Sequence, residues 1–155
     1  MEMLTKPDSG WSGFRLEGTS LWVLSYITNI PFEWLYRAIH GLEADEPFFV
    51  EAFMEQGRFL CHVSRSGCEI EIHEPDACVI KQHSSVAMPE FCRHLHDDII
   101  RDIDCWALWN CRYSEESDEG YSMRDFEERK RSLSGLLRRI EELTEKARMG
   151  KNDHP

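Results

Sequence analysis

The chain has 155 residues, of which 41% are hydrophobic and 11% aromatic, enough for a hydrophobic core in one domain. Its net charge is −11, and because an acidic surface repels phosphate backbones, direct nucleic-acid binding is not expected. No apolar run approaches the roughly 18 residues of a membrane span, and the first residues lack the layout of a secretory signal. We therefore expect one cytoplasmic globular domain over 11–149, with disordered ends at 1–10 and 150–155.

The first third of the chain carries segments that fit short strands and helices. WSGFRLEG (11–18) fits a short strand or an extended entry. TSLWVLSYITNI (19–30) is almost entirely apolar and fits either a capped helix or a buried strand, because short apolar runs do not separate the two. PFEWLYRAIHG (31–41) fits a helix, since proline suits the first helical position and glycine the residue after the last turn. The apolar residues expected on one face of this helix are Phe32, Leu35, Tyr36 and Ile39.

The next segments have a hydrophobic period of two, which is typical of strands. FFVEAFMEQ (48–56), RFLCHVSR (58–65) and CEIEIHE (68–74) each have strand length, and a glycine lies between each pair as a turn signal. The simplest arrangement is a three-stranded antiparallel meander. ACVIKQH (77–83) can add a fourth strand, so the predicted sheet covers about 48–83.

The rest of the chain is predicted to form two helices. SSVAMPEF begins a central amphipathic helix over about 88–109, with Ser84 or Ser85 near its cap. Ser122 begins a pattern that resembles a capping box, followed by a long C-terminal helix over about 123–149. Because the strands are grouped between helices and do not alternate with them, the sequence predicts an α+β fold. In this fold the small antiparallel sheet packs with N-terminal helices, the central helix and the C-terminal helix.

The stretch FCRHLHDD (91–98) concentrates side chains that bind metals and move protons. On a helix its apolar residues share one side, whereas His94 points away from that side and His96 lies about 200° around from His94. Two ligands placed in this way cannot meet one metal ion, so we expect a solvated helix face with surface ion pairs. The expected pairs are Arg93 with Asp97, Asp97 with Arg101, and His94 with Asp98.

The cysteines and the motif search give little support to an enzyme. Cysteines stand at positions 61, 68, 78, 92, 105 and 111, and in a cytoplasmic chain they are expected to be free thiols. No pair has C-x-x-C spacing, so no metal and no cofactor are expected. The common nucleophile, dinucleotide and phosphate-loop motifs are absent. The enzyme alternative is a Cys/His hydrolase or a metal-dependent enzyme that uses His73, His83 and His96.

The predicted sheet carries the strongest candidate surface. In the strand at 68–74, isoleucines alternate with charged residues, so one face is apolar and the other charged. In the strand at 48–56, one alternate set holds phenylalanines and glutamates. If the two charged sets share an outer face, aromatic anchors lie between carboxylates, as in protein interfaces; the other outcome is a helix that covers them. The candidate partner-binding residues are Glu51, Phe53, Glu55, Glu69, Glu71 and His73.

The charge distribution indicates the kind of partner. Residues 1–123 hold nine basic and 22 acidic residues (9 − 22 = −13), and residues 124–155 hold nine basic and seven acidic residues (9 − 7 = +2). An acidic body attracts basic partners. We therefore expect a protein-binding module, most concretely an inhibitor or immunity protein that neutralises a basic, nuclease-type toxin by occluding its active site. A second alternative is an oligomeric adaptor that self-associates through the C-terminal helix.

Overall fold

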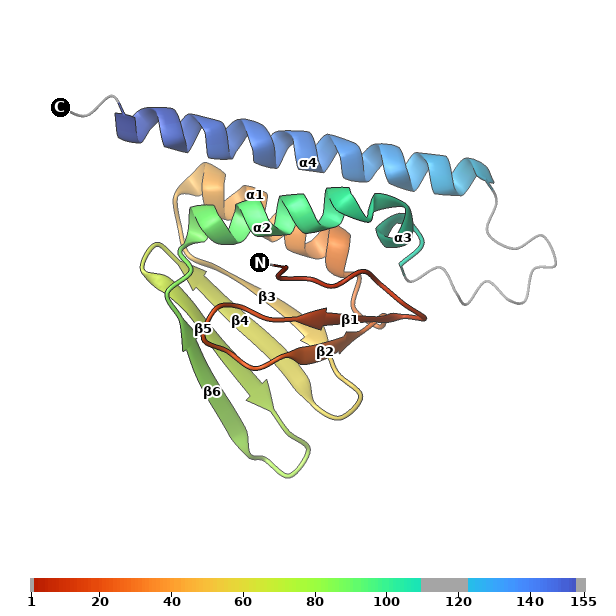
Figure 1. The fold of residues 1–155 in the computed structure, drawn as a ribbon, viewed down its shortest axis with the longest axis vertical. Coiled ribbons are helices and arrows are strands. Elements are labelled where there is room, and N and C mark those ends of the chain that lie inside the picture. The colour runs from red at the N-terminus through yellow and green to blue at the C-terminus, as the bar shows by residue number, and fades with distance from the viewer. Residues whose placement is uncertain (1, 110–122, 153–155) are drawn as a thin grey trace.

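The structure is a computed structural model that describes residues 2–109 and 123–152. It has an α+β fold with a two-stranded sheet, a four-stranded sheet and a long C-terminal helix, as the sequence predicts. Figure 1 shows the layers: α4 lies on α1 and α2, and these helices lie between α4 and the sheets. Within the described residues, no helix combines the length and the apolar character that a membrane crossing requires.

The chain begins with a β-hairpin in which β1 (Trp11–Phe14) pairs with β2 (Trp22–Ser25) in antiparallel register. The apolar run at 19–30 therefore contains a strand, and its helix alternative is wrong. The structure accordingly has one helix before the four-stranded sheet, where the sequence predicts more than one. Phe14 is fully buried, and its ring meets the ring of Phe59 on the four-stranded sheet with centroids 4.8 Å apart. The hairpin thus packs against the large sheet.

The segment before β1 is ordered where the sequence predicts disorder. Met3 and Leu4 are fully buried in the core. Their N–H groups donate hydrogen bonds to Asp98 Oδ2 at 2.8 and 2.9 Å. The prediction of disorder over 1–10 is wrong for this part of the chain, because two apolar side chains and a buried carboxylate hold it.

Helix α1 (Ile30–Ala44) is longer than predicted and buries a different face. Gly41 lies inside the helix and not after its end. A Cβ at this position would lie 2.4 Å from Phe48 Cδ1, so the glycine permits close packing of the helix on β3. Tyr36, expected on the buried face, is 59% exposed. The buried side centres on Trp34, which the expected face does not include.

The four-stranded sheet confirms the predicted meander, including its fourth strand. Its strands are β3 (Phe48–Phe53), β4 (Arg58–Ser64), β5 (Gly67–His73) and β6 (Val79–Ser84), in the order β3-β4-β5-β6. All neighbouring pairs are antiparallel. Alternate residues face α1, α2 and the hairpin, and most of these are buried. This buried set forms the inner face of the sheet.

The predicted central helix is two helices, α2 (Met88–Arg101) and α3 (Ile103–Ala107), separated by Asp102 with non-helical dihedral angles. Ser84 belongs to β6, and the N-cap of α2 is Ala87, so the expected serine cap is wrong. The apolar side of α2 faces the core, where the ring of Phe91 meets that of Phe48 with centroids 5.8 Å apart.

Helix α4 (Met123–Asn152) buries its apolar residues within the chain. Leu133, Leu137 and Ile140 are buried, and the helix packs on α1, α2 and α3. The helix continues past 149, so residues 150–152 are not the tail that the sequence predicts. Residues 153–155 and the expected cap at Ser122 lie outside the described residues.

Candidate protein-binding surface

The outer face of the four-stranded sheet carries the side chains that alternate with the buried set. Strand register places twelve residues on it in three rows of four. Among the described residues, the helices all lie on the opposite side (Figure 1). The rows are Phe49, His62, Glu69 and His83; then Glu51, Leu60, Glu71 and Lys81; then Phe53, Arg58, His73 and Val79.

The structure brings together most of the residues that the sequence singles out. Of the six candidates, Glu51, Phe53, Glu69, Glu71 and His73 share the outer face. Glu55 lies outside the ladder, in the exposed turn between β3 and β4. Sequence reasoning missed the residues that β4 and β6 add to this face. The period-two alternation within those two strands was the signal that could have found them.

The carboxylates of the outer face are paired with cations or histidines. Glu51 pairs with Arg58, and Glu69 with His83. Glu71 Oε2 lies 3.4 Å from His62 Nε2 and 3.8 Å from His73 Nε2, and its Oε1 lies 3.8 Å from the Lys81 ammonium. With neutral histidines, three glutamates, one arginine and one lysine give −3 + 2 = −1. The face is therefore nearly balanced in charge, whereas the sequence predicts a face dominated by carboxylates.

Exposed apolar groups lie at one end of this face, which we call the turn end. It comprises Phe53 and Val79, together with the β3–β4 turn (54–57) and the β5–β6 loop (74–78). Phe53 is 48% exposed and Val79 is 46% exposed. The adjoining turn and loop contribute the acidic residues Glu55, Glu74 and Asp76. This end has the combination of apolar anchors and carboxylates that the sequence places on the whole face.

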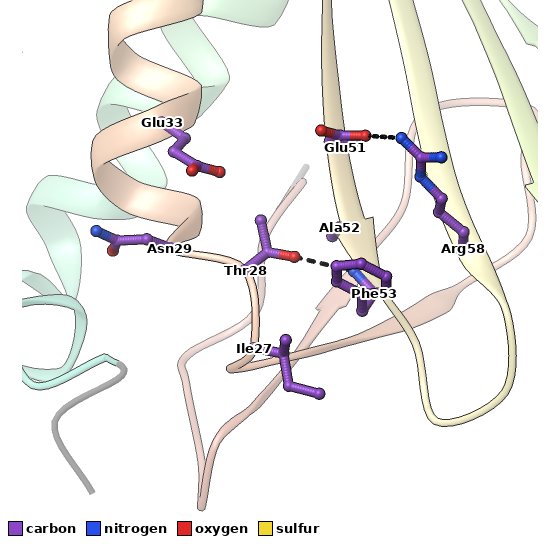
Figure 2. Close-up of a pocket in the computed structure, with 8 residues that line it drawn as sticks. All are labelled: Ile27, Thr28, Asn29, Glu33, Glu51, Ala52, Phe53 and Arg58. Atoms are coloured by element: carbon purple, nitrogen blue, oxygen red, sulfur yellow. Dashed lines mark hydrogen bonds and ion pairs between the residues drawn. The ribbon is translucent and has the colours of Figure 1, made fainter. Parts of the chain in front are cut away.

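A pocket of about 240 Å³ opens beside the turn end, between the start of α1 and the edge strand β3 (Figure 2). The Phe53 N–H donates to Thr28 Oγ1 at 3.0 Å, which fixes one wall of the pocket. Figure 2 shows Glu33 reaching from α1 toward β3, whereas Asn29 turns away from that strand. The lining residues are Ile27, Thr28, Asn29, Glu33, Glu51, Ala52, Phe53 and Arg58.

The chemistry of this pocket suits a long basic side chain. Ile27 is 60% exposed, so it and Phe53 offer apolar surface at the mouth of the pocket. Glu51 pairs with Arg58, whereas Glu33 forms no ion pair with any described residue. Lysine and arginine bury their methylene stems on apolar surface and keep the charged head near a counter-charge. The pocket offers both features.

The FCRHLHDD stretch has a structural role that its helical pattern does not reveal. Asp98 is buried and accepts hydrogen bonds from two N-terminal N–H groups and from Arg101 Nη1 at 3.1 Å. His96 lies 2.9 Å from Asp97 and 3.8 Å from Glu141 of α4. Arg101 pairs with Asp98, so the expected pairs Asp97–Arg101 and His94–Asp98 are wrong; His94 instead lies 3.8 Å from Glu90. The prediction of a solvated helix face therefore missed Asp98, which is buried and binds the N-terminal segment.

Three of the described cysteines are buried, and the three histidines of the enzyme alternative lie on different elements. Cys61, Cys68 and Cys92 are buried and free. A hydrogen bond with Cys68, together with burial, raises the pKa of Cys61, and burial raises the pKa of Cys92 to about 12, so both thiols stay protonated. His73 and His83 lie on the outer face, whereas His96 lies on α2, on the other side of the sheet.

Among the described residues, one cluster of side chains has the atoms to bind a metal ion. In the β5–β6 loop, ligand atoms of Glu74, Asp76 and Cys78 lie within 4.8 Å of one another. The Cys78 N–H also donates to Asp76 Oδ1 at 3.1 Å, so the loop's own backbone uses one of these carboxylates. Exposed acidic groups of this kind are common without an ion, and we assign no metal here.

Comparison with known proteins provides no family for this chain. No protein-family model, no curated protein and no solved structure matches it. By its fold and surface, the protein is an α+β domain. Its described residues leave one face of the four-stranded sheet uncovered.

Proposed function

We propose that this chain is a protein-binding module whose turn end and adjoining pocket receive a basic protein partner. The observation that carries the proposal is the pocket itself, where exposed Ile27 and Phe53 lie beside Glu33, a carboxylate without an ion pair among the described residues. Interface anchors concentrate where apolar surface and charge meet in a pocket. A lysine or arginine of the partner inserts there, and the acidic turn and loop around it add attraction.

The net charge of −11 supports a basic partner, because it speeds encounter with positively charged surfaces. In its most specific form, the proposal is an inhibitor or immunity protein that occludes the active site of a nuclease-type toxin. A nuclease cleft is positive because its substrate is a polyphosphate, so an acidic inhibitor complements it. We place the protein in the cytoplasm, in keeping with the free thiols of the described cysteines.

Affinity capture with matched variants tests this proposal. The immobilised chain is exposed to lysate of the cells that encode it, at low and at high salt. Glu33→Lys is compared with Glu145→Lys, a charge reversal at an exposed position on α4. Phe53→Ala is compared with Ile100→Ala, which removes a similarly exposed apolar side chain from α2. We expect the wild-type chain to capture a basic protein. Glu33→Lys and Phe53→Ala should no longer bind this protein, whereas both control variants should still bind it.

Two results would overturn the proposal. One is a captured partner that is acidic, and the other is equal retention by all four variants. If the captured protein is a nuclease, the specific form predicts that the wild-type chain abolishes cleavage and that Phe53→Ala does so only at much higher concentration. An unaffected nuclease would leave a binding module without inhibitory function.

A further inference from the structure

The two edges of the four-stranded sheet use their backbone polar groups differently. At the β3 edge, the Phe53 N–H donates to Thr28 Oγ1, and the Trp34 indole donates to the Glu51 carbonyl, both at 3.0 Å. Helix α1 and the residues before it thus close this edge. At the other edge, β6 pairs with β5 alone among the described strands.

The register shows which groups of β6 point outward. The Glu74 N–H bonds the Cys78 carbonyl at 2.9 Å where the two strands begin to pair. Hydrogen-bonded and non-hydrogen-bonded pairs alternate along an antiparallel ladder. The N–H and C=O groups of Val79, Lys81 and His83 therefore point away from β5. Within residues 2–109 and 123–152, none of these groups takes part in a further backbone hydrogen bond. Gly18 packs against the His83 carbonyl, so Val79 and Lys81 form the open part of this edge.

We propose that the β6 edge accepts an extended segment of a protein partner as an antiparallel fifth strand, with an apolar residue opposite Val79 and a carboxylate opposite Lys81. Strand addition to an open edge supplies backbone hydrogen bonds, and side chains on alternate positions supply selectivity. Val79 offers exposed apolar surface at one end of the edge. The Lys81 side chain is 72% exposed and has Glu71 on one flank only, so its other flank is free for a carboxylate.

A second copy of the chain is a poor occupant of the same edge. In the two-fold pairings of β6 with itself that use the outward groups, Lys81 lies directly opposite or diagonal to Lys81 of the second copy. Like charges directly opposite each other destabilise a strand pair, and a lysine in an edge strand is a common guard against self-association. Charge therefore favours a different protein that carries acidic residues in the added strand. This inference concerns the opposite edge from the pocket and does not depend on the proposed function.

The test uses a capped peptide, Thr-Glu-Thr-Val-Thr, which in antiparallel register places glutamate opposite Lys81 and valine opposite Val79. The control peptide is N-methylated at its glutamate and its valine, which removes the two N–H groups that would pair with β6. Amide exchange and chemical shifts of the full chain are followed by NMR. We expect the free protein to exchange the amides of 79 and 81 rapidly, and the unmethylated peptide to slow them severalfold.

Proline substitutions at two adjacent residues separate strand pairing from loss of fold. Lys81→Pro removes an outward N–H and no hydrogen bond to β5, so the protein should stay folded and lose peptide binding. Ile80→Pro is the contrasting variant, because its N–H bonds to β5, and it should disrupt the strand. Lys81→Glu should weaken binding about fivefold, the size of a cross-strand attraction turned into a repulsion.

Three results would overturn the proposal. The first is protection of the amides of 79 and 81 in the free protein, which would mean a closed edge. The second is equal binding of the N-methylated peptide, and the third is an absence of binding at millimolar peptide. The two proposals can be tested separately. If Phe53→Ala still binds the peptide normally, the proposal for the β6 edge holds whatever happens to binding at the pocket.

Discussion

The inner and outer faces of the four-stranded sheet come from the same strands but depend on different physics. On the inner face, Phe59 is fully buried between Phe14 and Trp34. On the outer face, carboxylates pair with cations and histidines in solvent, and apolar side chains such as Phe53 stay half exposed. The inner face therefore carries most of the stability of the fold, and the outer face contributes little to it.

The largest expected effect is a difference between two phenylalanines on adjacent strands. Phe59→Ala should lower the free energy of unfolding by about 3–5 kcal/mol, because it leaves a cavity in the core. Phe53→Ala should cost less than about 1 kcal/mol, since its side chain is already half exposed. Urea denaturation measures both. An equal cost at the two positions would contradict the division between the faces.

A second contrast compares two neighbouring aspartates on α2. Asp98→Ala should cost about 2–4 kcal/mol of unfolding free energy, because it leaves the buried N–H groups of Met3 and Leu4 without an acceptor. Asp97→Ala, at an exposed position, should change stability by less than about 0.5 kcal/mol. Thermal unfolding of the two variants gives the comparison. A small effect at Asp98 would mean that the N-terminal segment contributes little.

A third test uses the buried thiol of Cys92. Its pKa is raised by burial from the ordinary value of 9.0 to about 12, so the unfolded chain ionises first. The stabilisation from the neutral thiol is complete below pH 9 and is lost as pH rises toward 12, by up to about 1.4 kcal/mol per pH unit. Cys92→Ala should flatten the fall of stability over this window. Identical slopes for wild type and variant would show that the thiol ionises freely in the folded state.

The smallest expected effect lies on the outer face. Glu71→Gln should lower the free energy of unfolding by less than about 1 kcal/mol at neutral pH, despite its three charged or titratable neighbours, because exposed pairs are weak and screened by salt. Denaturation at low and high salt measures this contribution of the Glu71 ion pairs to stability. A loss of several kcal/mol would mean that the outer pairs hold the sheet together.

The sequence predicts the sheet well because each strand alternates over its whole length. The period in CEIEIHE places Ile70 and Ile72 inside and Glu69 and Glu71 outside, as the structure confirms. The pocket could not be predicted, because it joins Ile27 and Glu33 to Phe53 through packing of α1 on an edge strand. Local pattern does not determine such contacts.

The errors at the helices have a similar cause. Gly41 reads as a helix end, but its missing side chain makes room for Phe48. Asp98 reads as a surface charge, but it binds backbone groups 94 and 95 positions away in the chain. In both cases a long-range contact overrides a local signal that would otherwise have been sound.

The central claim is that a basic partner binds at the turn end and its pocket. Hydrogen–deuterium exchange of the full chain, with and without the captured partner, tests it most directly. We expect protection of residues 27–33 and 51–58 in the complex, and loss of that protection together with binding in Glu33→Lys. Protection confined to α4, with 27–33 and 51–58 unchanged, would contradict it.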